Sequence, residues 1–349
     1  MELNLSDEQQ QLVEAFGGLY AKESSTERVR GAEPLGHDPD LWDRLKENGA
    51  LEMSVDEASG GWGASLLDLA LVAEQHGRFL GSAPLIEAQV AARLLARLGS
   101  EAARSVLAPA LAGERLVTVA LHPPKKGVVG LVPSGAVADD VVFLEGDEVR
   151  HAVVAEAGKG RTPVKNIGSL PLADLVVPGN ASVLASGQAA AQAFDEAVTE
   201  WMVLMASALV GLATRSIEIG VEYVKERKAF GVPIGSFQAV SHGLADAATG
   251  TEGASLLARE AAWSADPDAE PERTPELAAL AFGFASDAAR EASYRSEHYH
   301  GGYGFMLEYD IQLYFRRARA WPAQFGPADV AFARGAAFRL ARRDNGEEA

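Results

Sequence analysis

Several residue types and segment types are missing from this chain of 349 residues, and each absence excludes a class of protein. There is no cysteine, so disulfides, thiolate metal sites and thiol nucleophiles are excluded. No run of 18 or more apolar residues occurs, so we expect no membrane span. The segment Met1 to Ser6 has no basic stretch followed by an apolar core, so we expect no secretory signal and a cytoplasmic location.

Basic residues are scarce as well. Lys and Arg together number 31 against 49 Asp and Glu, which gives a formal net charge of −18. Nonspecific nucleic-acid binding requires clustered Lys and Arg that neutralise phosphates, so we expect no nucleic-acid partner. The acidic balance is interpreted as a solubility feature, and a local basic pocket for a phosphorylated cofactor remains compatible with it.

The periodicity and the prevalent residue types change twice along the chain, which predicts three segments. Residues 1–112 have helical periodicity, beginning with Ser6 and Gln9 in the spacing of a capping box. Residues 113–187 hold short Val-rich runs separated by Pro, Gly and acidic turns, as strands are. Residues 188–349 are helical again, so the chain is predicted to be α+β and mostly α.

Individual elements follow from the same patterns. Strands are predicted at 116–121, 127–132, 136–144, 149–155, 170–177 and 181–185. Helices are predicted at about 65–81, 84–98, 200–227, 276–299 and 311–342. Ser82 is the expected N-cap of the helix over 84–98, and Pro84 suits its first turn because the missing N–H would have no helical partner there.

Two motifs carry chemistry. The first is Arg227-Lys-Ala-Phe-Gly231, followed by Pro233-Ile234 and Phe237-Gln238. A guanidinium presents a planar fork of donors that matches a phosphate, although a lone Arg at a helix end could equally complement the helix dipole. The second motif, roughly 60 residues further on, is His300-Gly301-Gly302-Tyr-Gly-Phe305, whose paired glycines allow close approach to a ligand or serve a simple turn.

Together these motifs, and the order of helices, β segment and helices, resemble the acyl-CoA dehydrogenase family. The resemblance implies an N-terminal helical domain, a middle β-barrel or sandwich domain and a C-terminal four-helix bundle, with FAD as cofactor. In that family the Arg at the position of Arg227 contacts the flavin pyrophosphate across a subunit interface. Phe230 would pack on the cofactor, and Phe237 and Gln238 would meet its ribityl-to-adenine portion. His298, at the family's Gln position, would touch the adenosine end of the flavin together with Gly301 and Gly302.

The elements that act on a subunit's own flavin and substrate depart from this pattern. Phe325 stands where the family usually carries the catalytic Glu of Glu-Gly-Thr, and phenylalanine accepts no proton. Some members place the base on the long helix, at the position of Trp201; Glu200 is adjacent but about 100° around a helix, and is expected at the surface. The flavin-contacting loop Thr-Glu-Pro-x-x-Gly-Ser-Asp has no counterpart after Val117 to Leu121. No catalytic residue is therefore predicted.

A chain that keeps the elements reaching into a neighbour's flavin and loses its own resembles one subunit of the heteromeric acyl-CoA dehydrogenases of actinobacterial steroid side-chain degradation. The implied partner is a homologous catalytic subunit, which would hold most of the acyl-CoA pocket in an α2β2 assembly. Two alternatives remain open: an autonomous homomeric enzyme with a displaced base such as Glu200, and a non-enzymatic scaffold. No metal is expected, because His298 and His300 lie on different helical faces.

Overall fold

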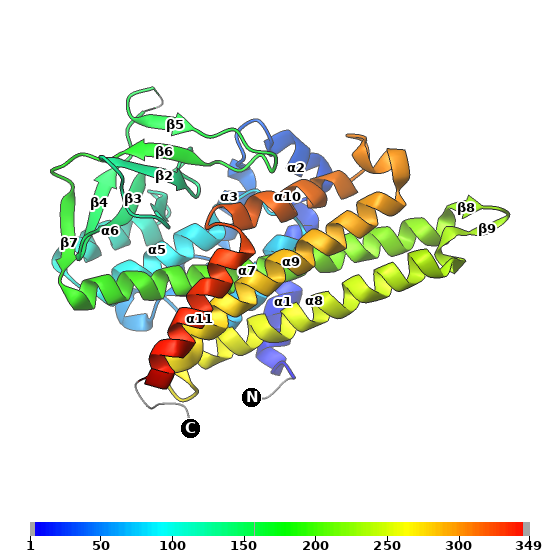
Figure 1. Cartoon of the computed structure of the whole chain (residues 1–349). Helices are drawn as coiled ribbons and strands as arrows, with labels where there is room; N and C mark the ends of the chain where they lie inside the picture. The colour runs from blue at the N-terminus through cyan, green and yellow to red at the C-terminus, as the bar shows by residue number, and fades with distance from the viewer. Residues whose placement is uncertain (1–3, 157, 345–349) are drawn as a thin grey trace. The chain divides into compact units, whose positions relative to one another are not determined.

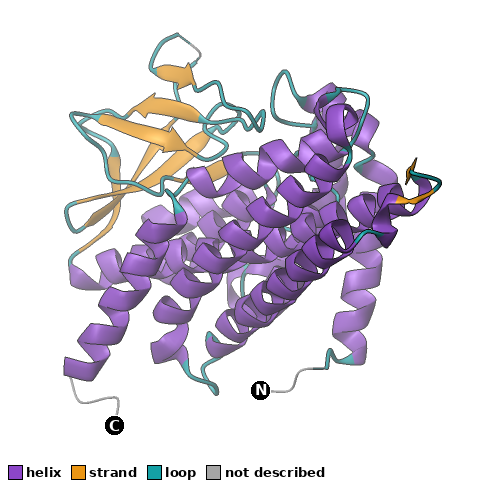
Figure 2. Ribbon diagram, turned by 45° about the vertical axis from the view of Figure 1, so that its right-hand side comes forward, coloured by secondary structure: helices purple, strands orange, loops and turns teal. Residues whose placement is uncertain are grey.

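The computed structural model describes residues 4–156 and 158–344. Contacts between residues divide the chain into two compact units. The helical unit comprises Met1–Thr26, Ala70–Gly81 and Met202–Ala349, and the mixed unit comprises Glu27–Leu69 and Ser82–Trp201. The strands, orange in Figure 2, fall within the residues of the mixed unit, apart from one small hairpin whose residues belong to the helical unit. The division of the sequence at residues 112 and 187 stays a prediction.

The helical unit is built from long helices, which confirms the predicted helical C-terminal part (Figure 1). Its elements are α1 (Asp7–Glu23), the end of α4 (Leu66–Arg78), most of α7 (Gln188–Glu226), β8 (Lys228–Ala229), β9 (Val232–Pro233), η3 (Ile234–Ser236), α8 (Gln238–Ser264), η4 (Pro271–Arg273), α9 (Thr274–Tyr299), η5 (Gly301–Phe305), α10 (Ile311–Ala323) and α11 (Ala328–Asp344). α9 packs against α8, α10 and α11. Helix α7 begins at Gln188, earlier than predicted.

The predicted capping box at the start of α1 is confirmed. The Gln9 backbone N–H donates to Ser6 Oγ at 3.2 Å, and the Ser6 N–H donates to Gln9 Oε1 at 3.1 Å. Two donors that the first helical turn leaves without partners are thereby satisfied. Helix α7 is long and apolar enough to cross a membrane, but 94% of its most apolar window is buried, as in the core helix of a folded domain.

Helices α4 and α7 cross closely because glycines lie at the crossing. A Cβ at Gly77 would lie 1.7 Å from the Ala208 carbonyl oxygen, and a Cβ at Gly211 would lie 1.9 Å from the Glu74 carbonyl oxygen. In both cases the overlap is with backbone, which cannot move aside as the end of a flexible side chain can. The two helices are therefore fixed at backbone contact distance.

Replacing Gly211 with alanine is expected to lower the free energy of unfolding by about 1–3 kcal/mol, because the added methyl group overpacks the crossing. Gly250→Ala on α8 is the matched control, since a Cβ there meets nothing within 4 Å. That variant should gain about 0.5–1 kcal/mol from helix propensity. Urea denaturation of both variants tests this, and equal midpoints would show that the crossing tolerates a methyl group.

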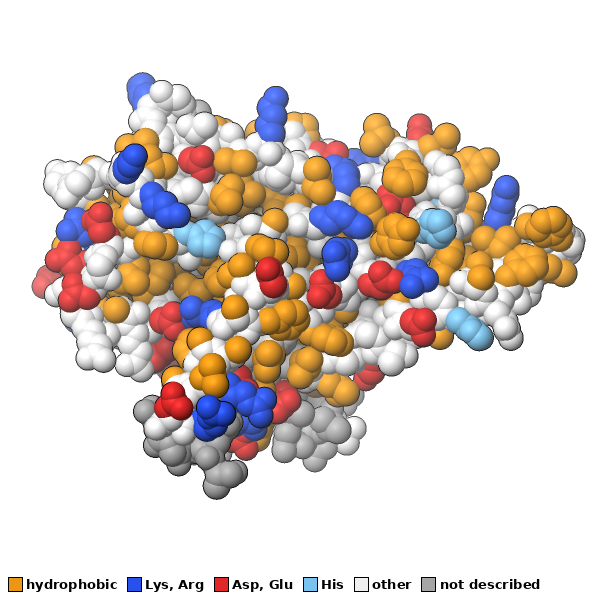
Figure 3. All heavy atoms as spheres, in the orientation of Figure 1, with side chains coloured by type: hydrophobic (Ala, Val, Ile, Leu, Met, Phe, Trp, Pro, Cys, Tyr) orange, Lys and Arg blue, Asp and Glu red, His pale blue; other side chains and the backbone are white. Residues whose placement is uncertain are grey.

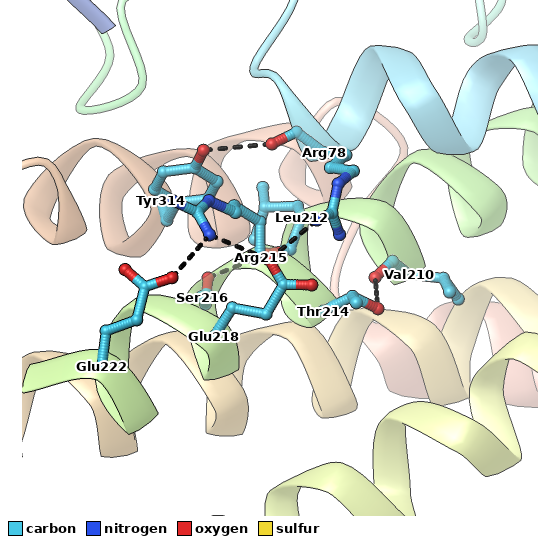
Figure 4. Close-up of polar contacts among 9 residues, drawn as sticks. All are labelled: Arg78, Val210, Leu212, Thr214, Arg215, Ser216, Glu218, Glu222 and Tyr314. Carbon is cyan, nitrogen blue, oxygen red and sulfur yellow. Dashed lines mark hydrogen bonds and ion pairs between the residues drawn. The ribbon is translucent and has the colours of Figure 1, made fainter. Parts of the chain in front are cut away.

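Polar contacts hold α4, α7 and α10 together near the same crossing (Figure 4). Arg78 Nη2 and Arg215 Nη1 donate to Glu218 Oε2 at 2.8 Å and 2.9 Å, and the Tyr314 hydroxyl donates to the Arg78 carbonyl at 3.0 Å. Burial raises the pKa of Glu218, but the hydrogen bonds and charges of the two guanidinium groups outweigh it, so this pKa is lowered. The end of α7, which leads to Arg227, is thereby anchored.

Over its described residues, the mixed unit contains two sheets and four helices besides the start of α4 and the first part of α7. The helices are α2 (Thr26–Ala32), α3 (Pro39–Glu47), α5 (Leu85–Leu98) and α6 (Glu101–Leu111), with short turns η1 (Glu52–Ser54) and η2 (Glu57–Ser59). The strands are β1 (Val117–Val119), β2 (Val128–Val132), β3 (Asp140–Glu145), β4 (Glu148–Val153), β5 (Arg161–Pro163), β6 (Ala173–Val176) and β7 (Ser182–Ser186). One sheet has the order β1-β3-β4-β7 and the other β2-β6-β5, with β1–β3 as the parallel pair.

Buried side chains from both sheets form one core, which identifies this segment as a sandwich. Val141 and Phe143 of β3 contribute to it from one sheet, and Val129 and Leu175 from the other. The predicted N-cap of α5 is wrong: Pro84 occupies the N-cap without a side-chain hydrogen bond, and the Ser82 carbonyl instead accepts from the Asp38 N–H at 2.7 Å. Ser82 therefore serves the loop before the helix.

Candidate functional site

The segment after α7 folds into a short hairpin that projects Phe230. β8 pairs with β9, and the two residues between them, Phe230 and Gly231, have φ values of +53° and +84°. Tight two-residue turns of β-hairpins require this left-handed conformation, which Asn and Gly usually supply. In phenylalanine it costs about 1–2 kcal/mol. The Phe230 ring is 96% exposed, so packing within the chain does not offset that strain, which points to a ligand or partner.

Arg227 lies between the end of α7 and this hairpin. Its backbone N–H continues the helix by donating to the Tyr223 carbonyl at 2.9 Å, and its carbonyl accepts from Ile234 N–H at 2.8 Å. The residue is exposed, and among residues 4–156 and 158–344 no acidic side chain pairs with its guanidinium. The backbone is therefore fixed while the donor fork remains available to an anion, as the phosphate prediction requires.

The second motif lies next to the first. The rings of Tyr223 and His300 stack with centroids 3.9 Å apart, and the Tyr223 hydroxyl donates to the His300 carbonyl at 3.4 Å. Gly301 has φ +60°, which a side chain would strain. A Cβ at Gly302 would meet no atom within 4 Å, so the chain itself leaves open space there. A ligand that approaches the backbone at Gly302 would fill that space.

The remaining predicted cofactor residues belong to the same end of the helical unit. The Tyr299 hydroxyl donates to the Ala239 carbonyl at 3.2 Å, which ties the end of α9 to the start of α8 beside Gln238. His298 is exposed and stacks on Tyr294 with centroids 5.7 Å apart. The Phe237 ring meets the Phe230 ring edge-on at 6.3 Å. The structure thus brings all seven predicted residues to one end, while their roles stay predictions.

Apolar side chains that the sequence prediction did not include are exposed at this end too (Figure 3). They are Val232, Tyr303, Phe305, Met306 and Leu307, with exposed fractions from 41% to 72%. An apolar groove of about 520 Å³ lies beside the hairpin, between α7 and α8. Exposed apolar surface of this kind marks an interaction site, and the run Phe305-Met306-Leu307 is the sequence signal for it. These residues and the seven above are called the exposed end.

Carboxylates are absent from both positions at which the resemblance would place a base, Phe325 and Trp201. Phe325 is half-buried, and its ring packs edge-on against Phe282 with centroids 5.8 Å apart. Trp201 is 1% exposed in the mixed unit, where its indole lies beside the carboxyl group of Glu87. Burial raises the pKa of Glu87, and hydrogen bonds from its own backbone, Trp201 and Ser134 offset part of that rise. No sequence pattern marks Glu87, since Trp201 and Ser134 come from distant segments.

Glu200 is not the surface carboxylate that the sequence suggested. It is 7% exposed, and its Oε1 accepts from Arg93 Nη2 at 2.9 Å and from Arg97 Nη2 at 2.5 Å. Burial alone would raise the pKa of Glu200, but the charges and hydrogen bonds of the two guanidinium groups outweigh it and lower this pKa. A carboxylate held in this way is a structural ion pair and a weak proton acceptor.

A buried carboxyl group with a raised pKa lies next in sequence to a residue of the exposed end. Glu297, in the last turn of α9, is 2% exposed; burial raises its pKa to about 7, and the charge of Arg319 opposes that rise. The folded chain thus keeps a proton that the unfolded chain releases above about pH 4.3, so stability falls as pH rises from there to about pH 7.

Glu297→Gln is therefore expected to stabilise the chain by about 1 kcal/mol at pH 8, after allowance for screening by solvent, and to change little near pH 5. Urea denaturation at both pH values measures this effect. Glu308→Gln is the control, because Glu308 is exposed at the same end. An unchanged pH dependence in Glu297→Gln would contradict the assignment of this proton.

Two family models match this chain, one over its N-terminal part and one over its C-terminal part. Residues 6–115 match the acyl-CoA dehydrogenase N-terminal domain, and residues 192–338 match the acyl-CoA dehydrogenase C-terminal domain. The chain is 33% identical over 328 residues to acyl-CoA dehydrogenase IpdE2 of Mycolicibacterium smegmatis, covering 93% of this chain and 96% of that protein. It is 29% identical over 325 residues to acyl-CoA dehydrogenase FadE27 of Mycobacterium tuberculosis, covering 83% and 85% of the two chains.

Solved structures resemble it along the whole chain. A chain of the ChsE4–ChsE5 complex from Mycobacterium tuberculosis superposes with a TM-score of 0.86 at 25% identity, covering 100% of both chains. A chain of the Tcur3481–Tcur3483 steroid ACAD also superposes with a TM-score of 0.86, at 24% identity, covering 97% of this chain and 99% of that one. The latter likeness shows the fold alone, which agrees with the predicted order of helical, sheet and helical segments.

Proposed function

The chain belongs to the acyl-CoA dehydrogenase family, and we propose that it is the flavin-sharing, catalytically incomplete subunit of a heteromeric acyl-CoA dehydrogenase. FAD is the cofactor of this family. One contrast carries the proposal: the residues that would grip a flavin are exposed, whereas the usual base position holds Phe325 packed on Phe282. The residues proposed to hold the flavin are thus accessible to a ligand from outside the chain, and the chain lacks a proton acceptor at the position where the reaction needs one.

The exposed end fits an FAD tail by its chemistry. Arg227 offers a planar pair of donors to a pyrophosphate, and the Gln238 amide and the His298 imidazole can each donate or accept at an adenosine edge. The open space above Gly302 admits close backbone approach, and Phe230 offers an aromatic face. When bound, FAD supplies the acceptor for the hydride that leaves the β-carbon of the acyl thioester. The task of this chain's residues is to hold and orient the cofactor tail.

The partner we propose is a homologous catalytic subunit. It would supply the carboxylate that removes the α-proton, together with most of the acyl-CoA pocket. Support comes from ChsE4–ChsE5 and Tcur3481–Tcur3483, which are described as pairs of unlike chains. By analogy with the second, described as a steroid ACAD, we propose a steroid-derived acyl-CoA as the substrate class and an α2β2 assembly.

Co-expression with a homologous catalytic chain tests the proposal. We expect the chain alone to bind no stoichiometric FAD, and the purified complex to hold about half as many flavins as chains, because each flavin is shared by two unlike chains. Flavin content is read from absorbance of the released cofactor. Full flavin occupancy of this chain alone would overturn the proposal, as would dehydrogenation of an acyl-CoA without a partner.

A second candidate is an autonomous dehydrogenase with a displaced base. Glu200 is a poor candidate because two guanidinium groups hold its carboxylate. Glu87 is the better one, since its buried carboxyl group with a raised pKa lies beside Trp201. Glu87→Gln separates the readings: loss of activity with flavin retained favours the autonomous enzyme, whereas unchanged activity of the complex favours the shared-flavin subunit.

A further inference from the structure

A cavity in the mixed unit contains none of the residues discussed so far. Helix α6 covers one face of the four-stranded sheet and leaves a space of about 390 Å³ against it. Its polar lining comes from Arg115, Asp140, His151 and Ser182 and, on α6, from Ser105, whereas its apolar lining includes Ala102 and Val153. The volume lies at the lower end of the range of small-molecule pockets.

The pairing of the strands places these side chains on one face. Asp140 of β3 lies directly opposite Val153 of β4, and His151 of β4 lies directly opposite Ser182 of β7. Directly opposed residues point to the same face of a sheet, as do residues two positions apart on one strand. All four side chains therefore face α6 together.

Asp140 organises the polar side of the cavity. It is 2% exposed, its Oδ1 lies 2.8 Å from His151 Nε2, and its Oδ2 accepts from Arg115 Nε. Burial raises the pKa of Asp140, but the hydrogen bonds and charges of His151 and Arg115 outweigh it, so this pKa is lowered. Each oxygen of the carboxylate is already engaged, and the two partners are fixed in orientation by it.

The polar groups that remain are mostly donors. Arg115 keeps Nη1, and Ser182 keeps its hydroxyl, without a hydrogen-bond partner in the described part of the chain. The Nε2 atom of His151 is engaged with Asp140, which leaves Nδ1 as the ring nitrogen that has no hydrogen-bond partner among the described residues. Beside these donors Val153 is 66% exposed, an apolar surface that α6 leaves uncovered.

We propose that this cavity is a binding site for a small organic carboxylate, whose anionic end meets Arg115 and His151 and whose apolar body lies against Val153. A singly charged carboxylate suits these donors better than a phosphate does, because one guanidinium nitrogen remains and the positive charge of Arg115 is already shared with Asp140. The apolar wall requires an organic body beyond the charged group.

Isothermal titration of the full-length chain, together with its partner where the two co-purify, tests the site with benzoate as the probe. We expect saturable binding with a dissociation constant of about 1 mM or below, and at least about 10-fold weaker binding of benzyl alcohol, which has the same ring without the charge. Inorganic phosphate should bind at least about 10-fold more weakly than benzoate. Absence of saturable benzoate binding, or equal binding of all three probes, would overturn the proposal.

Variants locate the site. Arg115→Gln is expected to weaken benzoate binding about 10-fold or more, and Arg104→Gln, on the exposed side of α6, is expected to leave it unchanged. Since Arg115→Gln also removes a partner of buried Asp140, Ala102→Phe provides a second route that fills the cavity and leaves that ion pair intact. Benzoate that binds Ala102→Phe as tightly as the unaltered chain would place its site elsewhere and overturn the proposal.

Discussion

Replacing Arg227 with alanine is expected to weaken FAD binding by the assembled complex about 10- to 100-fold. The guanidinium is exposed and has no acidic partner in the described part of the chain, so its loss removes a charge-assisted contact to the cofactor alone. The free energy of unfolding of the chain should change by about 0.5 kcal/mol or less for the same reason. Flavin titration of the apo complex measures the first quantity, and urea denaturation the second.

Two further variants sharpen this test. Arg227→Lys keeps the charge and loses the planar fork, so an intermediate loss of affinity is expected. Lys228→Ala removes an exposed charge at the next position and controls for long-range attraction. Unchanged flavin content in Arg227→Ala would favour the scaffold alternative, because a scaffold has no need of a phosphate contact.

Glu200→Gln is expected to have the largest effect on stability, a loss of about 3–5 kcal/mol. The substitution leaves Arg93 and Arg97 in a partly buried site without the carboxylate that both contact. Glu196→Gln is the matched control, because Glu196 pairs with Arg97 at 3.2 Å from a side chain that is 44% exposed. An exposed pair of this kind contributes about 1 kcal/mol or less. Denaturation in urea near pH 7 measures both variants.

The same ion pair predicts a dependence on pH. The folded-state pKa of Glu200 is lowered, so its contribution to stability is present above the unfolded value of about 4.3 and is lost as pH falls through the lower folded value. Glu200→Gln should therefore differ most from the unaltered chain near neutral pH and least in acid. A variant that folds normally but loses dehydrogenation would instead identify Glu200 as a base.

Much of the fold could be predicted because local patterns agree with it. The Ser6 capping box and the Val-rich runs identify α1 and most strands. Among the elements for which no bounds were predicted, three are short or interrupted: α2 has seven residues, β5 has three and ends in Pro163, and α6 contains Pro109. The fourth, α8, has 27 residues and lies in the part predicted to be helical only as a whole. Ser100, which caps α6 by accepting from Ala103 N–H at 3.0 Å, was a usable signal for that helix.

The candidate site, like the fold, could be predicted from the sequence only in part. Motif spacing led to the prediction of all seven cofactor residues, since each lies on one of two continuous segments. It could not identify the left-handed backbone of Phe230, because that conformation is usual for Asn or Gly and is imposed here by the two-residue turn. Nor could it identify the burial of Glu200 and Glu87, since their partners come from segments distant in the sequence. Tertiary contacts decide such electrostatics.

The hairpin tip also bears on how the cell must make this chain. A phenylalanine that is 96% exposed, together with the exposed Phe305 and Leu307, makes the chain by itself prone to self-association. If the proposed catalytic subunit covers this surface, copies synthesised in excess of it would be taken up by chaperones and proteases, so the abundance of this chain should follow that of the catalytic subunit. Under the proposed function, matched synthesis of the two chains therefore follows from exposed apolar side chains, one of them on a two-residue turn.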